Sequence, residues 1–457
     1  MKTLHITASY KPAYIYGGPI QSVAKLCEGI LSFDSAQDDI TQGDITHGDS
    51  NQNGKSRDGE CGKNELEVLT TRANGKEELD VEVGKAHLID GIKVTYFKRW
   101  TKDHSHFSPG LLWALRKKIN QHTNPPSLTI PTHSPSSKRR QEPPRLTGTS
   151  PKEANELVIH IHAWWNLVSV LSCWVAKWYT VPVILSPRGM LNDYTQSNRN
   201  SFSKKVIHQF IGKGLLKYVH IHATSEQEKL EILKITTPKS IAVIPNLVDV
   251  KGINKRKVES LKLKAECAEP TLTFKLLFLS RIEEKKGLEL LLEGLSTINF
   301  DYCLTIAGSG NENYIKSLKR KVESLKLGDR VKWIGQVGNE EKFKLMAEHG
   351  LLVLTSYNEN FANVVIESLS VGTPVLISER VGLADYVAVN ELGWICSLEP
   401  NDIAEKITEA YGAIAKRQKI NSTAPFIIEK DFNEEALVGR YLEFYEDILH
   451  LSSEYLV

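Results

Sequence analysis

Cysteine is scarce in this chain, and its six cysteines are scattered through 457 residues with no Cys-x-x-Cys pair. That spacing argues against a zinc knuckle or a disulfide framework, and reduced thiols in a cytoplasm are the simplest interpretation. An excess of charge of one sign is also missing, because 57 basic side chains are balanced by 55 acidic ones to a net charge of +2. The whole-protein field therefore gives no attraction toward nucleic acid, and we expect no nucleic-acid partner.

Long hydrophobic runs are missing as well. The most apolar segment, residues 167–186, contains Lys177 and Pro182, and it falls short of the roughly 20 uninterrupted apolar residues that a membrane span needs. We expect a buried helix followed by a strand there. The N-terminus has neither the apolar core nor the small-residue cleavage site of a secretory signal, so the chain is expected to be cytoplasmic.

Motifs for a catalytic metal are also lacking. The sequence contains no Asp-x-Asp, Walker loop or His-Glu-x-x-His, so we expect no metal and no cofactor. Residues 49–60 match a calcium-loop pattern, but Lys55 and Arg57 would repel a cation and helices do not flank the segment. Calcium binding is therefore not expected at this position.

Two stretches differ in composition from their surroundings. Residues 34–64 are rich in Asp, Gly, Asn and Gln, whereas residues 122–155 are rich in Pro, Ser and Thr. Neither carries enough large apolar side chains to offset the ordering of its backbone. We expect both to be mobile insertions.

Outside these stretches, short apolar strands alternate with helices in two series. Such alternation predicts parallel sheets covered on both faces, and two series predict two doubly wound domains that bind ligands at the carboxyl ends of their strands. In the first series strands are expected at 2–8, 66–71, 92–98, 157–161, 182–186, 219–223 and 241–244, with helices beginning near 20, 109, 166, 203 and 226. In the second, strands are expected at 275–280, 303–307, 331–333, 351–354 and 374–377, with helices at 287–297, 311–327, 339–348 and 362–371.

The most informative motif follows the apolar strand at 351–354. A polar loop there opens a helix, and Glu359 and Glu367 lie eight positions apart around the junction. Backbone N–H groups lack internal partners at such a junction, so it is suited to an anion or a sugar. The plain alternative is that both glutamates are surface carboxylates near a helix N-terminus.

A second motif ends the first strand of the second series. Arg281 and Lys286 lie on one strand-to-helix turn, followed by Gly287. Two cations there would neutralise a diphosphate as its charge grows during bond cleavage. A solvated, charged turn is the alternative interpretation.

Together these residues resemble the Glu-x7-Glu and Arg-x4-Lys-Gly elements of the retaining glycosyltransferases of the group 1, family 4 type. The resemblance implies a GT-B fold, in which two Rossmann-like α/β domains face each other across a cleft and a C-terminal helix crosses back to the first domain. The expected boundaries are 1–246 for an acceptor-binding domain, 247–431 for a nucleotide-sugar-binding domain and 432–457 for the returning helix.

The resemblance also implies roles for the motif residues. Arg281 and Lys286 hold the departing diphosphate, Glu359 contacts the donor sugar, and Glu367 binds the ribose hydroxyls. The backbone N–H groups of Asn360, Phe361, Ala362 and Asn363 face the sugar or phosphate. Ala362 and Asn360 stand where the family usually has glycine, which narrows the approach of the backbone to the ligand.

Site residues are also expected in the first domain. Gly17 and Gly18 precede a helix and match the family's glycine loop beside the donor phosphate. By resemblance, His162 lies close to the anomeric centre, although a lone histidine is more often structural. We expect His160 and His162 to point to opposite sides of the sheet, which disfavours a shared metal. Acceptor contacts are predicted for two further residues, Arg188, which could instead cap a turn, and Trp164.

A basic amphipathic segment covers residues 199–218, with four lysines among large apolar side chains. Such a segment can rest on an anionic membrane, and peripheral association with the inner membrane surface is one interpretation. An ordinary core-facing helix with a lysine-rich outer face is the other.

The sequence thus predicts a hexosyltransferase that moves a sugar from a nucleotide diphosphate donor to a glycan or lipid-linked acceptor during surface polysaccharide synthesis. Two alternatives remain open at this stage. One is a GT-B epimerase or phosphorylase, and the other is a sugar-nucleotide-binding protein without turnover. The base, sugar, acceptor, linkage and oligomeric state are not specified by the motifs.

Overall fold

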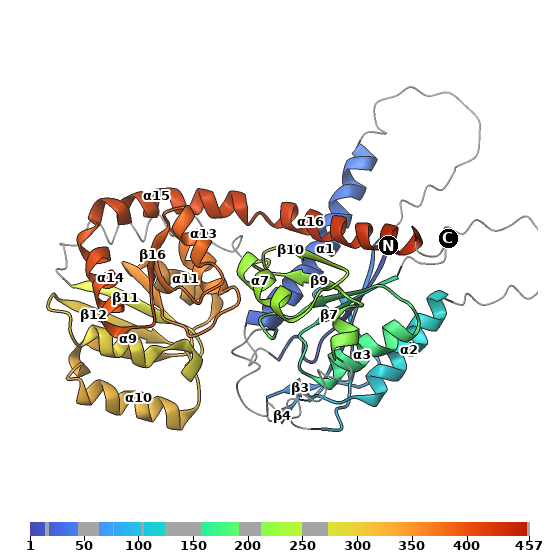
Figure 1. Ribbon diagram of the computed structural model, residues 1–457, viewed down its shortest axis with the longest axis horizontal. Coiled ribbons are helices and arrows are strands. Elements are labelled where there is room, and N and C mark those ends of the chain that lie inside the picture. The colour runs from blue at the N-terminus through green and yellow to red at the C-terminus, as the bar shows by residue number, and fades with distance from the viewer. Residues whose placement is uncertain are drawn as a thin grey trace, which may run out of the picture.

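A computed structural model describes residues 1–13, 18–43, 64–75, 77–101, 105–123, 157–191, 212–248 and 273–454. Two α/β lobes lie side by side, and helices α15 and α16 run along one edge from one lobe to the other (Figure 1). Several predictions fall outside the described residues: Gly17, the calcium-like segment, the greater part of both predicted insertions and of the basic segment, and the helix expected near residue 203.

The first lobe is built on an eight-stranded sheet with the order β10-β9-β8-β7-β1-β2-β6-β5. All neighbouring strands run parallel except β5, which is antiparallel to β6. The strands are β1 Lys2–Ile6, β2 Glu65–Thr71, β5 Ala86–Ile89, β6 Ile92–Phe97, β7 Leu157–His162, β8 Val183–Ser186, β9 His220–Ala223 and β10 Ser240–Val243, with a separate pair β3 Ala73–Asn74 and β4 Glu77–Glu78. The helices are α1 Gly18–Gly43, α2 Pro109–Thr123, α3 Leu167–Trp178, α6 Lys213–Leu216 and α7 Glu226–Ile235.

Helix α1 is longer than expected. It continues through Gly43, so residues 34–43, which were predicted to start a mobile insertion, are helical. Residues such as Asp and Gln tolerate a helix once a preceding turn has nucleated it. The expectation of an insertion beginning at residue 34 was therefore wrong at its start.

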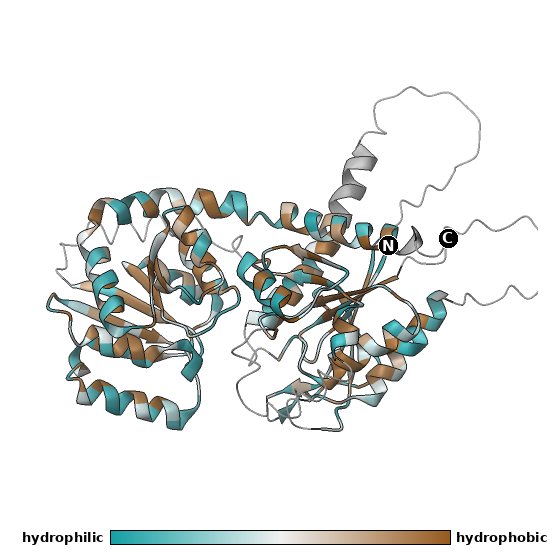
Figure 2. Ribbon diagram, in the orientation of Figure 1, coloured by the Kyte–Doolittle hydropathy of each residue, from teal (hydrophilic) through white to brown (hydrophobic). Residues whose placement is uncertain are grey.

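Alternate residues of β7 belong to two different cores. Ile159 and Ile161 pack in a cluster with α2 and α3, whereas Val158 packs in the cluster that contains α16. Successive side chains of a strand point to opposite faces, so α2 and α3 cover one face of the sheet and α16 covers the other. Both sheets are largely hydrophobic in Figure 2, with hydrophilic residues on the outer sides of the helices.

The second lobe has a fully parallel six-stranded sheet with the order β13-β12-β11-β14-β15-β16. Its strands are β11 Phe274–Leu279, β12 Tyr302–Ala307, β13 Val331–Gly335, β14 Leu351–Leu354, β15 Val375–Ser378 and β16 Gly393–Cys396. Its helices are α9 Leu288–Leu295, α10 Glu312–Ser324, α11 Asn339–Ala347, α12 Asn363–Ser370, α13 Ala384–Val389, α14 Pro400–Gly412 and α15 Ile414–Asp431.

The last helix, α16 (Glu434–Glu454), leaves the second lobe and packs on α1 and β7 of the first. Its buried face includes Tyr441 and Tyr445, which share a core cluster with Leu26 and Ile30 of α1. The predicted fold is confirmed: two doubly wound domains, with a C-terminal helix that crosses back. Among the described helices, none is both long enough and apolar enough to cross a bilayer, and segment 167–186 is the predicted helix and strand.

Candidate functional site

Strand order places the candidate site. In the second sheet β12 lies on one side of β11 and β14 on the other, so the loops that follow β11 and β14 diverge. The first sheet reverses its order in the same way between β1 and β7. Crevices form at such switch points, outside the carboxyl ends of the strands, and the predicted motifs follow β11, β14, β7 and β8.

Lys286 and Glu359 form an ion pair that joins the two C-terminal motifs. Lys286 is buried on a 3-10 turn (Glu284–Lys286) after β11. The turn is held against the end of β14 by Gly287, whose φ is 63° and whose added Cβ would lie 2.0 Å from the Thr355 carbonyl oxygen. Only glycine fits there, so Gly287 fixes the contact between the two motifs.

The surrounding cations control the charge of Glu359. Burial raises its pKa, but Lys286, Lys285 and Arg281 together outweigh burial, and the net pKa lies below the usual value. Lys285 has the opposite balance, because burial and the neighbouring cations lower its pKa against the pull of Glu359. The site thus holds an ionised carboxylate within a cluster of three cations.

Arg281 is accessible and faces the open side of this cluster. Its side chain is 43% exposed, and its guanidinium pairs with Glu283 at 2.7 Å. A carboxylate on an exposed guanidinium is readily exchanged for another anion, because exposed ion pairs contribute little free energy.

Helix α12 begins directly after the Glu359 loop. Ala362, its N-cap, has φ 64° and ψ 73°, which is the left-handed conformation where glycine is favoured. Among the described residues, none accepts a hydrogen bond from the backbone N–H groups of residues 360–363. These groups form an unpaired cluster of donors at a positive helix end.

A second helix N-terminus faces the first across the domain boundary. Gly18 opens α1, and a Cβ added to it would lie 4.0 Å from Nδ2 of Asn363. The same Nδ2 donates to Ser22 of α1 at 3.1 Å, and Asn363 Oδ1 accepts from Asn246 at 3.2 Å. The positive ends of α1 and α12 therefore converge on one region.

Asn360 also joins the domains. Its amide donates to Thr224 Oγ1 at 2.6 Å, and its carbonyl oxygen accepts from Ser225 at 3.3 Å. A Cβ on Gly189 would lie 2.8 Å from the Asn360 Cβ. The residue that stands in place of the family's glycine is thus a bridge between the domains.

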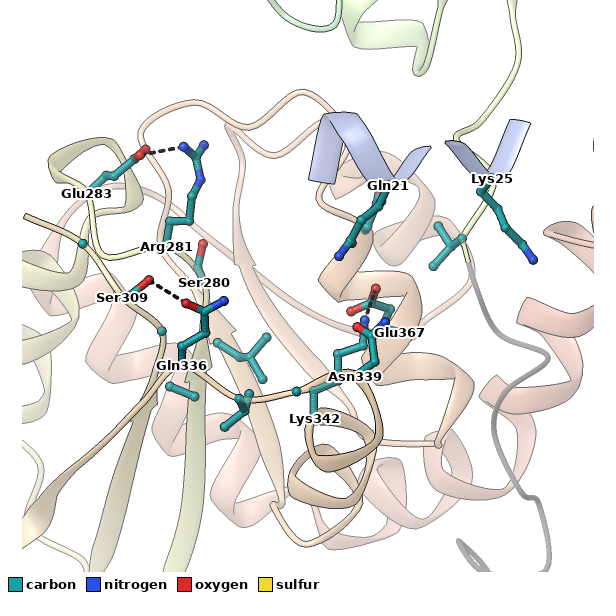
Figure 3. Close-up of a pocket in the computed structure, with 18 of the residues that line it drawn as sticks. Gln21, Lys25, Ser280, Arg281, Glu283, Ser309, Gln336, Asn339, Lys342 and Glu367 are labelled. Carbon is teal, nitrogen blue, oxygen red and sulfur yellow. Dashed lines mark hydrogen bonds and ion pairs between the residues drawn. The ribbon is translucent and has the colours of Figure 1, made fainter. Parts of the chain in front are cut away.

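A cleft of about 1060 Å³ lies between the domains. Figure 3 shows Gln21 and Lys25 of α1 on one side, with Arg281 and Glu367 among the residues of the second domain. Glu367 pairs with Lys342 at 2.8 Å. Of the four motif residues, Arg281 and Glu367 line this cleft. Lys286 and Glu359 are not among its lining residues, but they pair with each other close enough to Arg281 for its charge to lower the pKa of Glu359.

Sequence reasoning missed a second glycine loop in this cleft. Gly308 and Gly310 follow β12. A Cβ on Gly308 would lie 1.8 Å from the carbonyl oxygen of residue 280, and a Cβ on Gly310 would lie 2.0 Å from that of residue 282. The loop thus lies directly against the Arg281 turn, and Ser309 and Gln336 line the cleft beside it. A Gly-Ser-Gly sequence after an apolar strand was the signal that could have revealed it.

Arg188 occupies the first domain's side of the site. Its guanidinium donates to Asn246 Oδ1 at 2.9 Å and to His162 Nδ1 at 3.5 Å, and its Nε has no partner among the described residues. Burial lowers its pKa. A cation this poorly compensated, reaching an asparagine that contacts α12 through Asn363, is suited to bind an anion.

His162 does not contact the cleft directly. It is 1% exposed and lies behind Arg188. Because arginine can only donate, His162 Nδ1 accepts and its Nε2–H donates to His5 Nδ1 at 3.0 Å. His162 is thus placed to orient Arg188 rather than to touch a sugar.

The expected orientation of the two histidines was wrong. His160 and His162 lie on the same face of the sheet, with ring centroids 4.2 Å apart, because residues two positions apart on a strand share a face. Together with His5 they bring possible metal-ligand atoms within 4.8 Å of one another. Both nitrogens of His160 contact hydroxyl groups, however, and both of His162 are used, so within the cluster only His5 Nε2 has no partner among the described residues.

Trp164 is 0% exposed and packs in the core beneath α3. That position is inconsistent with direct contact between its indole and an acceptor. The prediction failed because an aromatic residue after a strand can turn either to the cleft or into the core, and the adjacent Trp165 is the one left partly exposed.

Residues 260–425 match the sequence profile of the family described as Glycosyl transferases group 1. The match covers most of the second lobe, from before β11 into α15. The matched segment contains all four of the motif residues Arg281, Lys286, Glu359 and Glu367, in agreement with the predicted resemblance to group 1 glycosyltransferases.

The curated relatives of this chain include sugar-transferring enzymes. N-acetyl-alpha-D-glucosaminyl L-malate synthase of Bacillus anthracis is 22% identical over 214 residues, which cover 46% of this chain and 55% of that protein. The chain thus spans about half the length of the curated relatives that it matches.

Solved structures extend the likeness to the whole fold. HepE of Anabaena, in complex with UDP and glucose, superimposes with a TM-score of 0.63 at 16% identity, covering 98% of this chain and 100% of that one. WaaG, a glycosyltransferase involved in lipopolysaccharide biosynthesis, gives a TM-score of 0.59 at 13% identity, covering 97% and 99%. The protein therefore has the GT-B fold.

Proposed function

We propose that this protein is a glycosyltransferase that moves a sugar from a nucleoside diphosphate sugar to a hydroxyl group of a glycan or lipid-linked acceptor. The observation that carries the proposal is the interdomain cleft, which Arg281 lines together with residues of the first turns of α1 and α12 (Gln21 and Asn363), while Lys285 and Lys286 lie with Arg281 around Glu359. This combination stabilises a diphosphate whose negative charge increases as it leaves. The match to the group 1 family and the UDP complex of HepE support the same assignment.

In the proposed reaction the bond between the anomeric carbon and the diphosphate oxygen breaks, and its electron pair goes to the diphosphate. Arg281 and Lys286 take up that charge. The acceptor hydroxyl bonds to the anomeric carbon on the same face, and its proton passes to the leaving diphosphate, so configuration is retained without a protein nucleophile.

The carboxylates have binding roles in this scheme. Glu359, held ionised by its cations, accepts a hydrogen bond from a donor sugar hydroxyl, and Glu367 exchanges its contact with Lys342 for the two ribose hydroxyls. The free N–H groups of residues 360–363 face the sugar or phosphate. Arg188, oriented by His162, binds the donor phosphate or an acidic acceptor group.

No metal is needed in this proposal, because three side-chain cations and two helix ends already supply positive charge. We expect transfer to continue undiminished in the presence of a chelator. Activity abolished by EDTA and restored by Mg²⁺ or Mn²⁺ would contradict this part of the proposal.

The acceptor is proposed to be a growing surface glycan, for which the likeness to WaaG gives support. A lipid-linked acceptor places the enzyme at the cytoplasmic surface of the inner membrane, as a peripheral protein.

The test is donor turnover by purified protein, followed by mass spectrometry over a panel of nucleotide sugars. We expect slow release of nucleoside diphosphate from one donor, and loss of at least about a hundredfold in Lys286→Ala and Glu359→Ala, because each removes a charge-assisted contact. Lys419→Ala and Glu391→Ala, which break an exposed ion pair of the same domain, are the matched controls and should keep full activity.

Other outcomes identify the alternatives. Donor binding without release in every condition indicates a sugar-nucleotide-binding protein, and interconversion of the free donor indicates an epimerase. The anomeric configuration of the product, read by NMR, decides between retention and inversion.

A further inference from the structure

Three helices of the first domain carry no acidic side chain. Helices α2, α3 and α6 lack Asp and Glu throughout, in a chain where acidic and basic residues are nearly equal in number. The basic residues of these helices and the α6 C-cap are Arg116, Lys117, Lys118, Lys177, Lys213 and Lys217. Helices α2 and α3 lie side by side in Figure 1, on the face of the sheet opposite α16.

The same helices expose tryptophan. Trp113 on α2 is 66% exposed, and Trp174 and Trp178 on α3 are 49% and 72% exposed. The α3 pair lies on one side of its helix with ring centroids 5.7 Å apart. Tryptophan normally buries most of its large surface, so three exposed indoles on two adjacent helices form an unusual patch.

Direct contacts make this one surface. Arg116 of α2 donates to the Tyr179 hydroxyl beside Trp178 at 2.7 Å. Lys177 of α3 donates to the Gly214 carbonyl of α6 at 3.1 Å. The aromatic patch and the basic side chains are therefore interleaved, and we call this surface the Trp–Lys face, defined by Trp113, Lys117, Trp174, Lys177, Trp178, Lys213 and Lys217.

Cations of the Trp–Lys face lack anionic partners within the described part of the chain. Neither Lys117 nor Lys177 forms an ion pair there; each lies near an aromatic ring instead, at 5.6 Å from Trp113 and 5.7 Å from Tyr218. Lys239 reaches the same Tyr218 ring at 4.5 Å. Burial first, and then repulsion from Lys177, lower the pKa of Lys239, as expected where positive charge is not compensated.

We propose that the Trp–Lys face docks on an anionic phospholipid membrane. Indole rings favour the boundary between lipid head groups and acyl chains, and unpaired lysines are attracted to acidic head groups. A second copy of this chain is a poorer occupant, because two such faces would bring like charges together. The docking rests on the peripheral membrane location in the proposed function. It uses none of the cleft residues, so failure of docking can be distinguished from failure of sugar transfer.

The test is flotation of the full chain with vesicles of phosphatidylcholine alone or with phosphatidylglycerol added. We expect the protein to float with the anionic vesicles and to remain in solution with the neutral ones. Trp113→Ser/Trp174→Ser/Trp178→Ser should weaken binding by at least about tenfold, because the indoles no longer insert. Lys117→Glu/Lys213→Glu/Lys217→Glu should weaken it by more than about a hundredfold, at roughly fivefold for each charge.

Matched controls lie on the second domain. Phe426→Ser removes an aromatic side chain that is 72% exposed, and Lys316→Glu/Arg320→Glu/Lys332→Glu makes the same charge change on exposed positions. Both controls should float like the parent protein, and all variants should keep their circular dichroism spectrum and turnover of a soluble donor.

Three results would overturn the proposal. The first is that the parent protein does not float with anionic vesicles. The second is that the tryptophan variant binds them as well as the parent does, which would indicate a polyanion site without insertion of the indoles. Sedimentation could also show a dimer that the tryptophan variant alone converts to a monomer, without vesicle binding. Absence of flotation by a parent protein that still turns over its donor would overturn the docking and leave the proposed transfer reaction untouched.

Discussion

At the scale of single residues, Ala362 is the clearest conflict between sequence and backbone. Its φ of 64° and ψ of 73° lie in the left-handed region, which is unfavourable for any residue with a Cβ. The strain is located at the loop that is proposed to hold the donor sugar. A glycine there would remove both the strain and the methyl group that narrows the approach to the ligand.

We therefore expect Ala362→Gly to raise the free energy of unfolding by about 1 kcal/mol, and to strengthen rather than weaken donor binding. Calorimetric melting and titration with a nucleoside diphosphate measure the two effects. Ala404→Gly, inside helix α14 and about as buried as Ala362, is the control and should lower stability by roughly the same amount. Destabilisation by Ala362→Gly would contradict the assigned strain.

The placement of the four motif residues after β11 and β14 could be predicted from sequence, because each lies on a local strand-loop-helix unit and the parallel sheet brings such units together. Contacts between residues of different domains could not be predicted from sequence. Asn360 reaches Thr224, and Asn363 reaches Ser22, across separations that no local pattern encodes. The burial of Trp164 could not be predicted from sequence either, because it depends on packing beneath α3.

At the scale of elements, α16 is fixed to the first domain by a hydrogen-bonded chain. The Ile244 carbonyl can only accept, so His222 Nε2–H donates to it at 2.8 Å. Ser186 then donates to His222 Nδ1, His160 Nε2–H donates to Ser186, and Tyr445 of α16 donates to His160 Nδ1. Each proton position follows from the one before it.

These proton positions predict that removing the hydroxyl group of each α16 tyrosine lowers the free energy of unfolding by a different amount. Tyr445→Phe leaves His160 Nδ1 buried without a donor and should lower the free energy of unfolding by roughly 1–3 kcal/mol. Tyr441→Phe, the matched control, should cost less than about 1 kcal/mol, because the His222 proton that it contacts is already accepted by Ile244. Chemical denaturation compares them, and equal losses would contradict the assigned chain.

Most elements were predicted within a few residues of their observed ends, since apolar strands and amphipathic helices differ in period. The missed strands are short or polar. β3 and β4 have two residues each, and β5 (Ala86–Ile89) and β16 (Gly393–Cys396) have four each. Such segments carry too little alternation to be recognised.

At the scale of the whole molecule, buried neutral histidines make stability depend on pH. Burial, with the nearby Arg188 cation, lowers the pKa of His5 and of His222 to about 3, and burial with neighbouring rings and Arg188 sets that of His160 and His162 well below 6.5. In the unfolded chain these groups titrate near 6.5. Below that pH the unfolded state binds more protons, so stability falls as the pH falls from about 6.5 toward 3.

We expect a steep loss of stability between pH 7.5 and 5.5, approaching about 1.4 kcal/mol per pH unit for each such histidine below pH 6.5. Glu359 does not contribute to the loss of stability between pH 7.5 and 5.5. Its lowered pKa gives stability that is present above about 4.5 and is lost only below it. Melting temperatures at the two pH values measure the effect, and a constant melting temperature would contradict the assignment.

The cleft between the two domains is the central claim, and a crystal structure of the protein with a bound nucleoside diphosphate tests it most directly. The account predicts the diphosphate between the N-termini of α1 and α12, in contact with Arg281 and Lys286, and the ribose hydroxyls on Glu367. A nucleotide bound elsewhere, or in the cleft without contact to any of these side chains, would contradict it.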